Sequence, residues 1–93
     1  MIPKYRKPVS PGVILSEEFL IPMKLSQVEL AKKMNVPVQR VNTIINGRRD
    51  MTAQTAVLLS IALGTSVEFW MNLQVACDIY KARLTLRASK HAA

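Results

Sequence analysis

The segment that decides the fold covers residues 26–47 and reads SQVELAKKMNVPVQRVNTIING. It predicts two short helices, Ser26–Met34 and Val38–Asn46, separated by a tight turn. At the start of the first helix, a serine and Glu29, three residues further on, have the spacing of a capping box. Asn35 tolerates the left-handed conformation that ends a helix, and the Val-Pro pair after it starts the chain in a new direction. Two short helices joined in this way are typical of a helix-turn-helix.

The second helix of this pair has one apolar side and one polar side. At about 100° per residue, Val41, Ile44 and Ile45 point together, as a core face requires. The opposite side carries small or uncharged polar side chains, which are Val38, Gln39, Asn42, Thr43 and Asn46. Glutamine and asparagine bind adenine through two hydrogen bonds, and the methyl group of Thr or Val contacts the thymine methyl. Because none of these side chains is charged, the polar side predicts contacts with base edges and phosphates and not merely a solubilising surface.

Positive charge surrounds this polar side. The chain has 13 Lys and Arg residues against 6 Asp and Glu residues, a net charge of +7 and a pI near 10.1. Charge alone fits a solvated surface as well as a phosphate-binding one. Three arginines flank the polar side where a phosphate backbone would run, namely Arg40, Arg48 and Arg49. Gln27 begins the preceding helix, whose first N–H groups are unpaired and suited to phosphate, and Lys32 and Lys33 add positive potential. Together these features favour DNA as the partner.

The composition excludes several other classes of protein. With 93 residues and a mass of 10.4 kDa, the chain suits one domain with one core. Few glycines and many Ala, Leu and Met residues favour an all-α fold. The N-terminus lacks the apolar segment of a signal peptide, and no apolar run approaches the ~20 residues of a membrane helix. Since the single Cys77 allows no internal disulfide, we expect a soluble, cytoplasmic protein.

Catalytic, metal and cofactor sites are not expected. The sequence contains no phosphate-binding glycine loop and no nucleophile elbow. Glu17 and Glu18 are adjacent, so a helix points them in different directions, which suits a surface better than acid–base catalysis. Cys77 is expected to be a small buried side chain far from His91, and no second histidine or paired cysteine completes a metal site. Trp70 is expected to anchor the core.

Three further helices are expected outside the pair. Capping residues and prolines place them between Ser10 and the stop at Pro22, between Thr52 and Gly64, and from Ser66 to about Leu86. The fold is therefore expected to be an all-α domain of five helices. The chain divides into a basic N-terminal arm (residues 1–9), a helix-turn-helix domain that ends in a dimerisation helix (residues 10–87) and a frayed tail (residues 88–93).

The fifth predicted helix is apolar on two roughly opposite sides. One stripe consists of Phe69, Leu73, Ala76, Tyr80 and Leu84. The other consists of Met71, Val75, Ile79, Ala82 and Leu86. A polar strip of Gln74, Asp78, Lys81 and Thr85 lies between them. A domain this small covers one stripe with its own helices, and either a second copy of the chain or its own C-terminal tail, folded back, covers the other. We expect the second copy, with Met71, Val75 and Ile79 at the dimer interface.

Several segments resemble a known family. The central segment is similar to the helix-turn-helix of the Cro and phage-repressor (XRE-like) family at Gln27-Val28-Glu29-Leu30-Ala31, Val36-Pro37 and Ile44-Ile45-Asn46-Gly47. Over nearly its whole length, the chain resembles the HigA family of addiction-module antitoxins. The most specific segment is Phe69-Trp70-Met71-Asn72-Leu73-Gln74. Further support comes from Pro11-Gly12-Val13-Ile14-Leu15, Asn46-Gly47-Arg48-Arg49 and Gly64-Thr65-Ser66.

The chain departs from the family at three places. Asn35 stands where the family usually has glycine, and asparagine preserves the geometry because it tolerates the left-handed conformation. Met23-Lys24-Leu25 replaces a frequent Leu-Gly-Leu. Cys77 replaces a frequent aromatic residue, which leaves that end of the last helix less bulky.

The resemblance implies a lambda-repressor-like fold and a homodimeric repressor that binds a palindromic operator upstream of its own genes. It also implies a second partner, a co-encoded HigB-like toxin that cleaves mRNA on the ribosome. By this resemblance Val38, Gln39 and Thr43 read bases, and Arg40 reaches either a base or a phosphate. The phosphate contacts are Gln27, Asn46 and Arg48, with the flanking Arg49 beside them. No short motif marks the toxin-binding surface.

Two other functions stay open at this point. A solitary transcriptional regulator without a toxin would share the same DNA chemistry, and a neighbouring small basic reading frame separates the two readings. A protein-interaction module would use the polar helix to bind a protein instead of DNA. Duplex binding that weakens steeply with salt distinguishes the DNA-binding readings from this one.

Overall fold

The computed structural model describes residues 7–92, with side chains over residues 7–88. Its elements are α1 (Pro11–Ile14), η1 (Leu15–Leu20, a π-helix), α2 (Ile21–Met23), α3 (Gln27–Met34), α4 (Val38–Ile45), α5 (Ala53–Leu63) and α6 (Val67–Ala92). Since α1, η1 and α2 follow one another without a break, they form one helix. The described residues therefore contain five helices and no strand, as predicted. Lys4 and Arg6 of the predicted basic arm lie outside the described residues.

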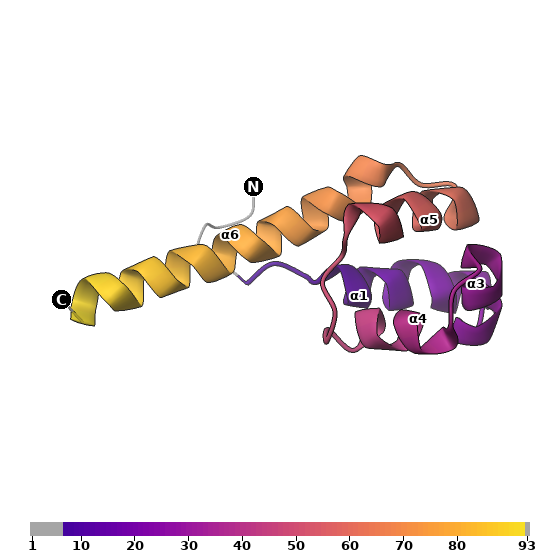
Figure 1. Ribbon diagram of the computed structural model, residues 1–93, viewed down its shortest axis with the longest axis horizontal. Helices are drawn as coiled ribbons and strands as arrows, with labels where there is room; N and C mark the ends of the chain where they lie inside the picture. The colour runs from indigo at the N-terminus through magenta and orange to yellow at the C-terminus, as the bar shows by residue number, and fades with distance from the viewer. Residues whose placement is uncertain (1–6, 93) are drawn as a thin grey trace.

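The helices form a body from which one helix projects. Figure 1 shows α1, α3, α4 and α5 gathered at one end, while α6 starts against α5 and runs far beyond the body. The molecule accordingly measures 49 × 28 × 19 Å. None of the helices in residues 7–92 combines the length and the hydrophobicity needed to cross a lipid bilayer.

The first helix does not stop at Pro22, which corrects one prediction. The chain stays helical to Met23, and Pro22 lies inside α2. Proline is unfavourable inside an α-helix because it lacks an N–H and its ring meets the carbonyl four residues earlier. The π-helical turns before it are wider: the Ile21 N–H bonds the Ser16 carbonyl five residues back, and the Leu25 N–H bonds the Leu20 carbonyl at 2.9 Å. This altered register accommodates the proline.

Lys24 ends this helix in the left-handed conformation, with φ 53°. A residue with a Cβ is strained there by about 1–2 kcal/mol, and glycine is not. We therefore expect Lys24→Gly to stabilise the protein by about 0.5–1 kcal/mol, which thermal unfolding would register as a rise of roughly 2–8 °C. Asn35→Gly is the matched control because Asn35 has nearly the same φ, 56°, but tolerates it better. A gain from Asn35→Gly equal to that from Lys24→Gly would contradict this explanation.

Gly12 allows α1 and α4 to touch. Gly12 is buried, and a Cβ built on it collides with the Ile44 carbonyl oxygen and lies 2.9 Å from that of Ile45. Both neighbours are main-chain atoms at the end of α4. The missing side chain therefore sets how closely α4 packs on the first helix.

Trp70 lies at the centre of the core, as predicted, with no exposed surface. Its ring packs against Phe19 and Phe69 with centroids 5.3 and 5.0 Å away. Its Nε1 donates a hydrogen bond to Thr65 Oγ1 at 2.6 Å, so the one polar atom of the indole is satisfied. Other buried apolar residues from every helix surround this cluster, among them Leu15, Leu30, Val41 and Leu59.

The side of α6 that faces the body differs from the predicted stripes. Trp70 and Gln74 are buried and Cys77 is partly buried, whereas Phe69 and Leu84 of the first predicted stripe keep 38% and 44% of their surface exposed. Gln74 belongs to the predicted polar strip between the two stripes, yet it is buried. The reason is a long-range hydrogen bond, described below, that no helical periodicity reveals.

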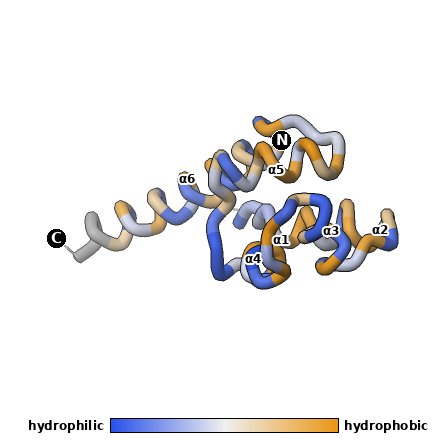
Figure 2. Tube along the Cα trace, turned by 45° about the vertical axis from the view of Figure 1, so that its right-hand side comes forward, coloured by the Kyte–Doolittle hydropathy of each residue, from blue (hydrophilic) through white to orange (hydrophobic). Residues whose placement is uncertain are grey.

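The second predicted stripe lies largely open. Val75 and Ile79 are 47% and 46% exposed, and Leu86 is more so, while Met71 packs partly against the core. Figure 2 shows hydrophobic and hydrophilic residues alternating along the projecting part of α6. The helix also continues to Ala92, past the end predicted near Leu86 and through the segment predicted to be frayed. Residues 88–92 contain good helix formers and neither glycine nor proline to stop it.

Candidate nucleic-acid interface

The start of α3 is fixed by the capping box that the sequence predicts. The Ser26 N–H donates to Glu29 Oε1 at 2.9 Å, and the Glu29 N–H donates to Ser26 Oγ at 3.0 Å. The hydrogen bond from the Ser26 main chain, followed by that from its hydroxyl, lowers the pKa of the Glu29 carboxyl below its ordinary value. The carboxylate is therefore charged and held at the helix end.

The turn between α3 and α4 also follows the prediction. Asn35 adopts the left-handed conformation, and the Val36 N–H bonds the Ala31 carbonyl at 3.0 Å. Pro37 is the N-cap residue of α4, in extended conformation. Helix α4 ends at Ile45, so Asn46 is its C-cap residue, one position earlier than expected. The observed elements therefore form the predicted helix-turn-helix.

The apolar side of helix α4 faces the core and its polar side faces solvent, as the sequence predicts. Val41 and Ile44 are buried, with 1% and 2% of their surface exposed, and Ile45 is partly buried. The predicted polar side faces solvent, with Val38, Gln39, Asn42 and Asn46 exposed and Arg40 and Thr43 partly so. The Thr43 hydroxyl donates to the Arg40 carbonyl at 3.0 Å, so its donor is used within the helix.

Three carboxamides on this surface are linked to one another. Asn46 Nδ2 donates to Asn42 Oδ1 at 3.1 Å, and Asn42 Nδ2 donates to Gln27 Oε1 at 3.2 Å. The sequence places Asn42 on the polar side but does not single it out as a site residue. Its bond to Gln27 spans 15 residues and depends on how α3 and α4 cross, so no local sequence signal indicates it.

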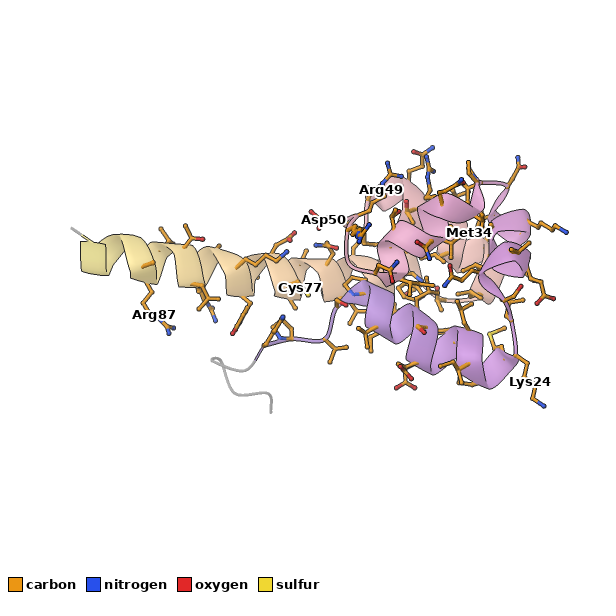
Figure 3. All side chains as sticks on the ribbon, turned by 90° about the horizontal axis from the view of Figure 1, so that it is seen from below. Lys24, Met34, Arg49, Asp50, Cys77 and Arg87 are labelled. Carbon is orange, nitrogen blue, oxygen red and sulfur yellow. The ribbon has the colours of Figure 1, made fainter. Side chains whose placement is uncertain are left out.

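The segment after α4 carries exposed cations. Gly47 is left-handed with φ 73°, and the Arg48 N–H bonds the Thr43 carbonyl at 2.9 Å. Arg48 and Arg49 are both exposed. Figure 3 shows Arg49 beside Asp50 at the end of the body from which α6 projects, with Lys24 at the opposite end. This segment places positive charge beside the exposed side of α4, as predicted.

A buried glutamine joins this segment to α6. Gln74 Oε1 accepts a hydrogen bond from the Met51 N–H at 2.7 Å, and Gln74 Nε2 donates to Asp78 Oδ1 at 2.9 Å. Both Gln74 and Met51 are buried. The main chain that follows Arg48 and Arg49 is thereby fixed to the last helix.

Cys77 lies beside the N-terminal segment (Figure 3). It is partly buried, and its Sγ donates to the Val9 carbonyl at 3.7 Å. Burial raises the pKa of its thiol above the ordinary value. It lines a groove of about 660 Å³ between the N-terminal segment, the end of α4 and α6.

Comparison with known proteins places this geometry in a family. The helix-turn-helix family profile matches residues 17–70. Antitoxin HigA-1 of Vibrio cholerae is 44% identical over 78 residues, which cover 84% of this chain and 73% of HigA-1. The uncharacterized HTH-type transcriptional regulator YbaQ of Escherichia coli K12 is 38% identical over 85 residues, which cover 91% of this chain and 75% of YbaQ.

A solved structure supports the same assignment. The Pseudomonas aeruginosa antitoxin HigA, determined with the higBA promoter, superposes with a TM-score of 0.83 at 34% identity, covering 88% of this chain and 89% of that one. The chain therefore belongs to the helix-turn-helix family and, within it, to the HigA group of antitoxins.

Proposed function

We propose that this chain is a DNA-binding antitoxin that represses its own operon as a homodimer in the cytoplasm and neutralises a HigB-like mRNA-cleaving toxin. The observation that carries the proposal is the exposed polar side of α4, with its flanking arginines, within a helix-turn-helix. The similar P. aeruginosa HigA was solved with promoter DNA, which supports DNA as the partner of that surface. The toxin partner is supported by the antitoxin names of the relatives.

The contacts divide into two classes. Base edges in the major groove are read by Val38, Gln39 and Thr43, with Arg40 within reach of a base or a phosphate. The phosphate contacts are Gln27, Asn46, Arg48 and Arg49. The first class determines which sequence is bound, whereas the second determines affinity and its dependence on salt.

We expect Gln39→Ala and Arg48→Ala to weaken binding in different ways. Gln39→Ala removes a base contact, so binding to the cognate site falls by about 1–3 kcal/mol and the preference at that base pair relaxes. Arg48→Ala weakens binding to all sequences and flattens the slope of log K against log salt by about 0.9. Fluorescence anisotropy with a duplex of the upstream region and a scrambled duplex, at several salt concentrations, measures both. If Gln39→Ala kept the sequence preference of the wild type, Gln39 would not be a base-contacting residue. If Arg48→Ala kept the wild-type slope of log K against log salt, Arg48 would not contact a phosphate.

We expect Ile79→Glu to convert the dimer into monomers. Ile79 and Val75 lie open on the projecting helix, and apolar surface of this kind is covered when a second copy packs there. A buried carboxylate in that interface has no partner and prevents association. Thr85→Glu is the control, because it adds the same charge to an exposed position on the predicted polar strip. Sedimentation velocity should give monomers for Ile79→Glu and dimers for Thr85→Glu, and intact Ile79→Glu dimers would place the interface elsewhere.

A solitary transcriptional regulator is the second candidate, favoured by the name of the similar YbaQ. The two candidates share the DNA-binding surface and differ in the toxin. Co-expression with the product of the neighbouring reading frame decides between them, since an antitoxin restores growth that the toxin arrests. If the chain were instead a protein-interaction module that does not bind DNA, the titrations would show no salt-dependent binding to a duplex.

A further inference from the structure

The carboxamide chain of Gln27, Asn42 and Asn46 has a direction. Asn46 donates to the Asn42 carbonyl oxygen, and Asn42 donates to the Gln27 carbonyl oxygen. Each carboxamide has one acceptor oxygen and one NH₂ donor group. The bond from Asn42 occupies the oxygen of Gln27, and Gln27 Nε2 bonds no other residue that the structure describes. The chain therefore presents an NH₂ group to solvent at its Gln27 end.

That end lies where an anion is favoured. Gln27 is the first residue of α3, and the first main-chain N–H groups of a helix have no partner inside the helix and favour an anion. The Glu29 carboxylate accepts from the Ser26 main chain through Oε1, and no hydrogen bond joins it to Gln27 within the described residues. If the Gln27 carboxamide turned over, it would present an oxygen to a phosphate and repel it.

We infer that Asn42 is a positioning residue of the DNA interface: it holds the Gln27 carboxamide with its NH₂ group toward the phosphate backbone. Asn42 and Asn46 are four residues apart on α4, so they face the same side, and Asn46 orients Asn42 in turn. The link also ties the first residue of α3 to the middle of the reading helix. This inference rests on the proposed DNA binding, and it assigns to Asn42 a role that acts through Gln27.

A double-mutant cycle tests this role. Wild type, Asn42→Ala, Gln27→Ala and the double variant are titrated onto a labelled duplex of mixed sequence at fixed salt, since a phosphate contact does not depend on sequence. We expect Asn42→Ala to weaken binding about fivefold, the size of one net hydrogen bond. In the Gln27→Ala background the same substitution should change binding by less than about twofold. Gln54→Ala, an exposed carboxamide on α5, is the control and should leave binding unchanged.

A second measurement separates positioning from general damage to the fold. In the DNA-free protein, ¹⁵N relaxation of the Gln27 side chain should show restricted motion in wild type and free motion in Asn42→Ala, with the melting temperature unchanged because Asn42 is exposed. A weakening by Asn42→Ala that persists fully in the Gln27→Ala background would overturn the inference and make Asn42 a direct DNA contact. No effect of Asn42→Ala on binding would overturn it as well. Failure of the wild type to bind any duplex would instead reject the proposed function.

Discussion

Replacing Gly12 with alanine should destabilise the protein by about 3 kcal/mol or more, at the upper end of overpacking effects. The new Cβ collides with the Ile44 carbonyl oxygen and closely approaches that of Ile45. Because these are main-chain atoms, no side-chain rotation relieves the collision, and α1 and α4 must separate. Thermal unfolding should show a fall of more than about 10 °C. Duplex binding should also weaken well below the melting temperature, since α4 shifts relative to α3.

Gly47→Ala is the control for this effect. Gly47 is left-handed with φ 73°, but a Cβ there meets nothing within 4 Å. The substitution therefore adds only the strain of that conformation, about 1–2 kcal/mol. If Gly12→Ala proved no more harmful than Gly47→Ala, the close contact between α1 and α4 would be refuted.

Replacing Trp70 with alanine should destabilise the protein by about 3–5 kcal/mol, a large part of the total stability of a small domain. Trp70 has no exposed surface and joins α6 to Phe19 on the first helix. Its removal leaves a cavity at the point where these helices meet. We expect urea unfolding to show a much lower midpoint, with the variant partly unfolded in buffer.

Trp70→Phe separates packing from hydrogen bonding. Phenylalanine keeps an aromatic ring against Phe19 and Phe69 but loses the donor to Thr65 Oγ1. The loss of stability in Trp70→Phe should be clearly smaller than that in Trp70→Ala. A Trp70→Phe variant as unstable as Trp70→Ala would mean that the hydrogen bond, and not the aromatic packing, dominates at this position.

The parts of the fold that depend on neighbouring residues were predictable from the sequence. The capping box at Ser26, the left-handed Asn35 and the stop at Gly64 each follow from the chemistry of a few consecutive residues, and the structure confirms all three. The two sides of α4 follow from helical periodicity. These features fix the helix-turn-helix because it is a local motif.

The features that sequence reasoning missed depend on contacts between distant residues. The helix continues through Pro22 because a π-helical segment precedes it, and the residue types do not predict the hydrogen-bond register of that segment. Gln74 looks like a surface residue on a helical wheel, yet it is buried by its bond to Met51, 23 positions away. The Gln27–Asn42 bond likewise requires the crossing of two helices. The assignments of base and phosphate contacts stay predictions until binding is measured.

Helix α6 connects two points whose relative orientation is fixed by the number of residues between them. Gln74 is hydrogen-bonded to the Met51 main chain in the loop that carries the arginines, and Ile79 lies on the open face of the same helix. One residue inserted between Gln74 and Ile79 would rotate the open face by about 100° around the helix axis while the loop stayed in place. The number of residues between these two positions therefore matters as much as their identity, because it sets the angle at which two copies of the domain would meet.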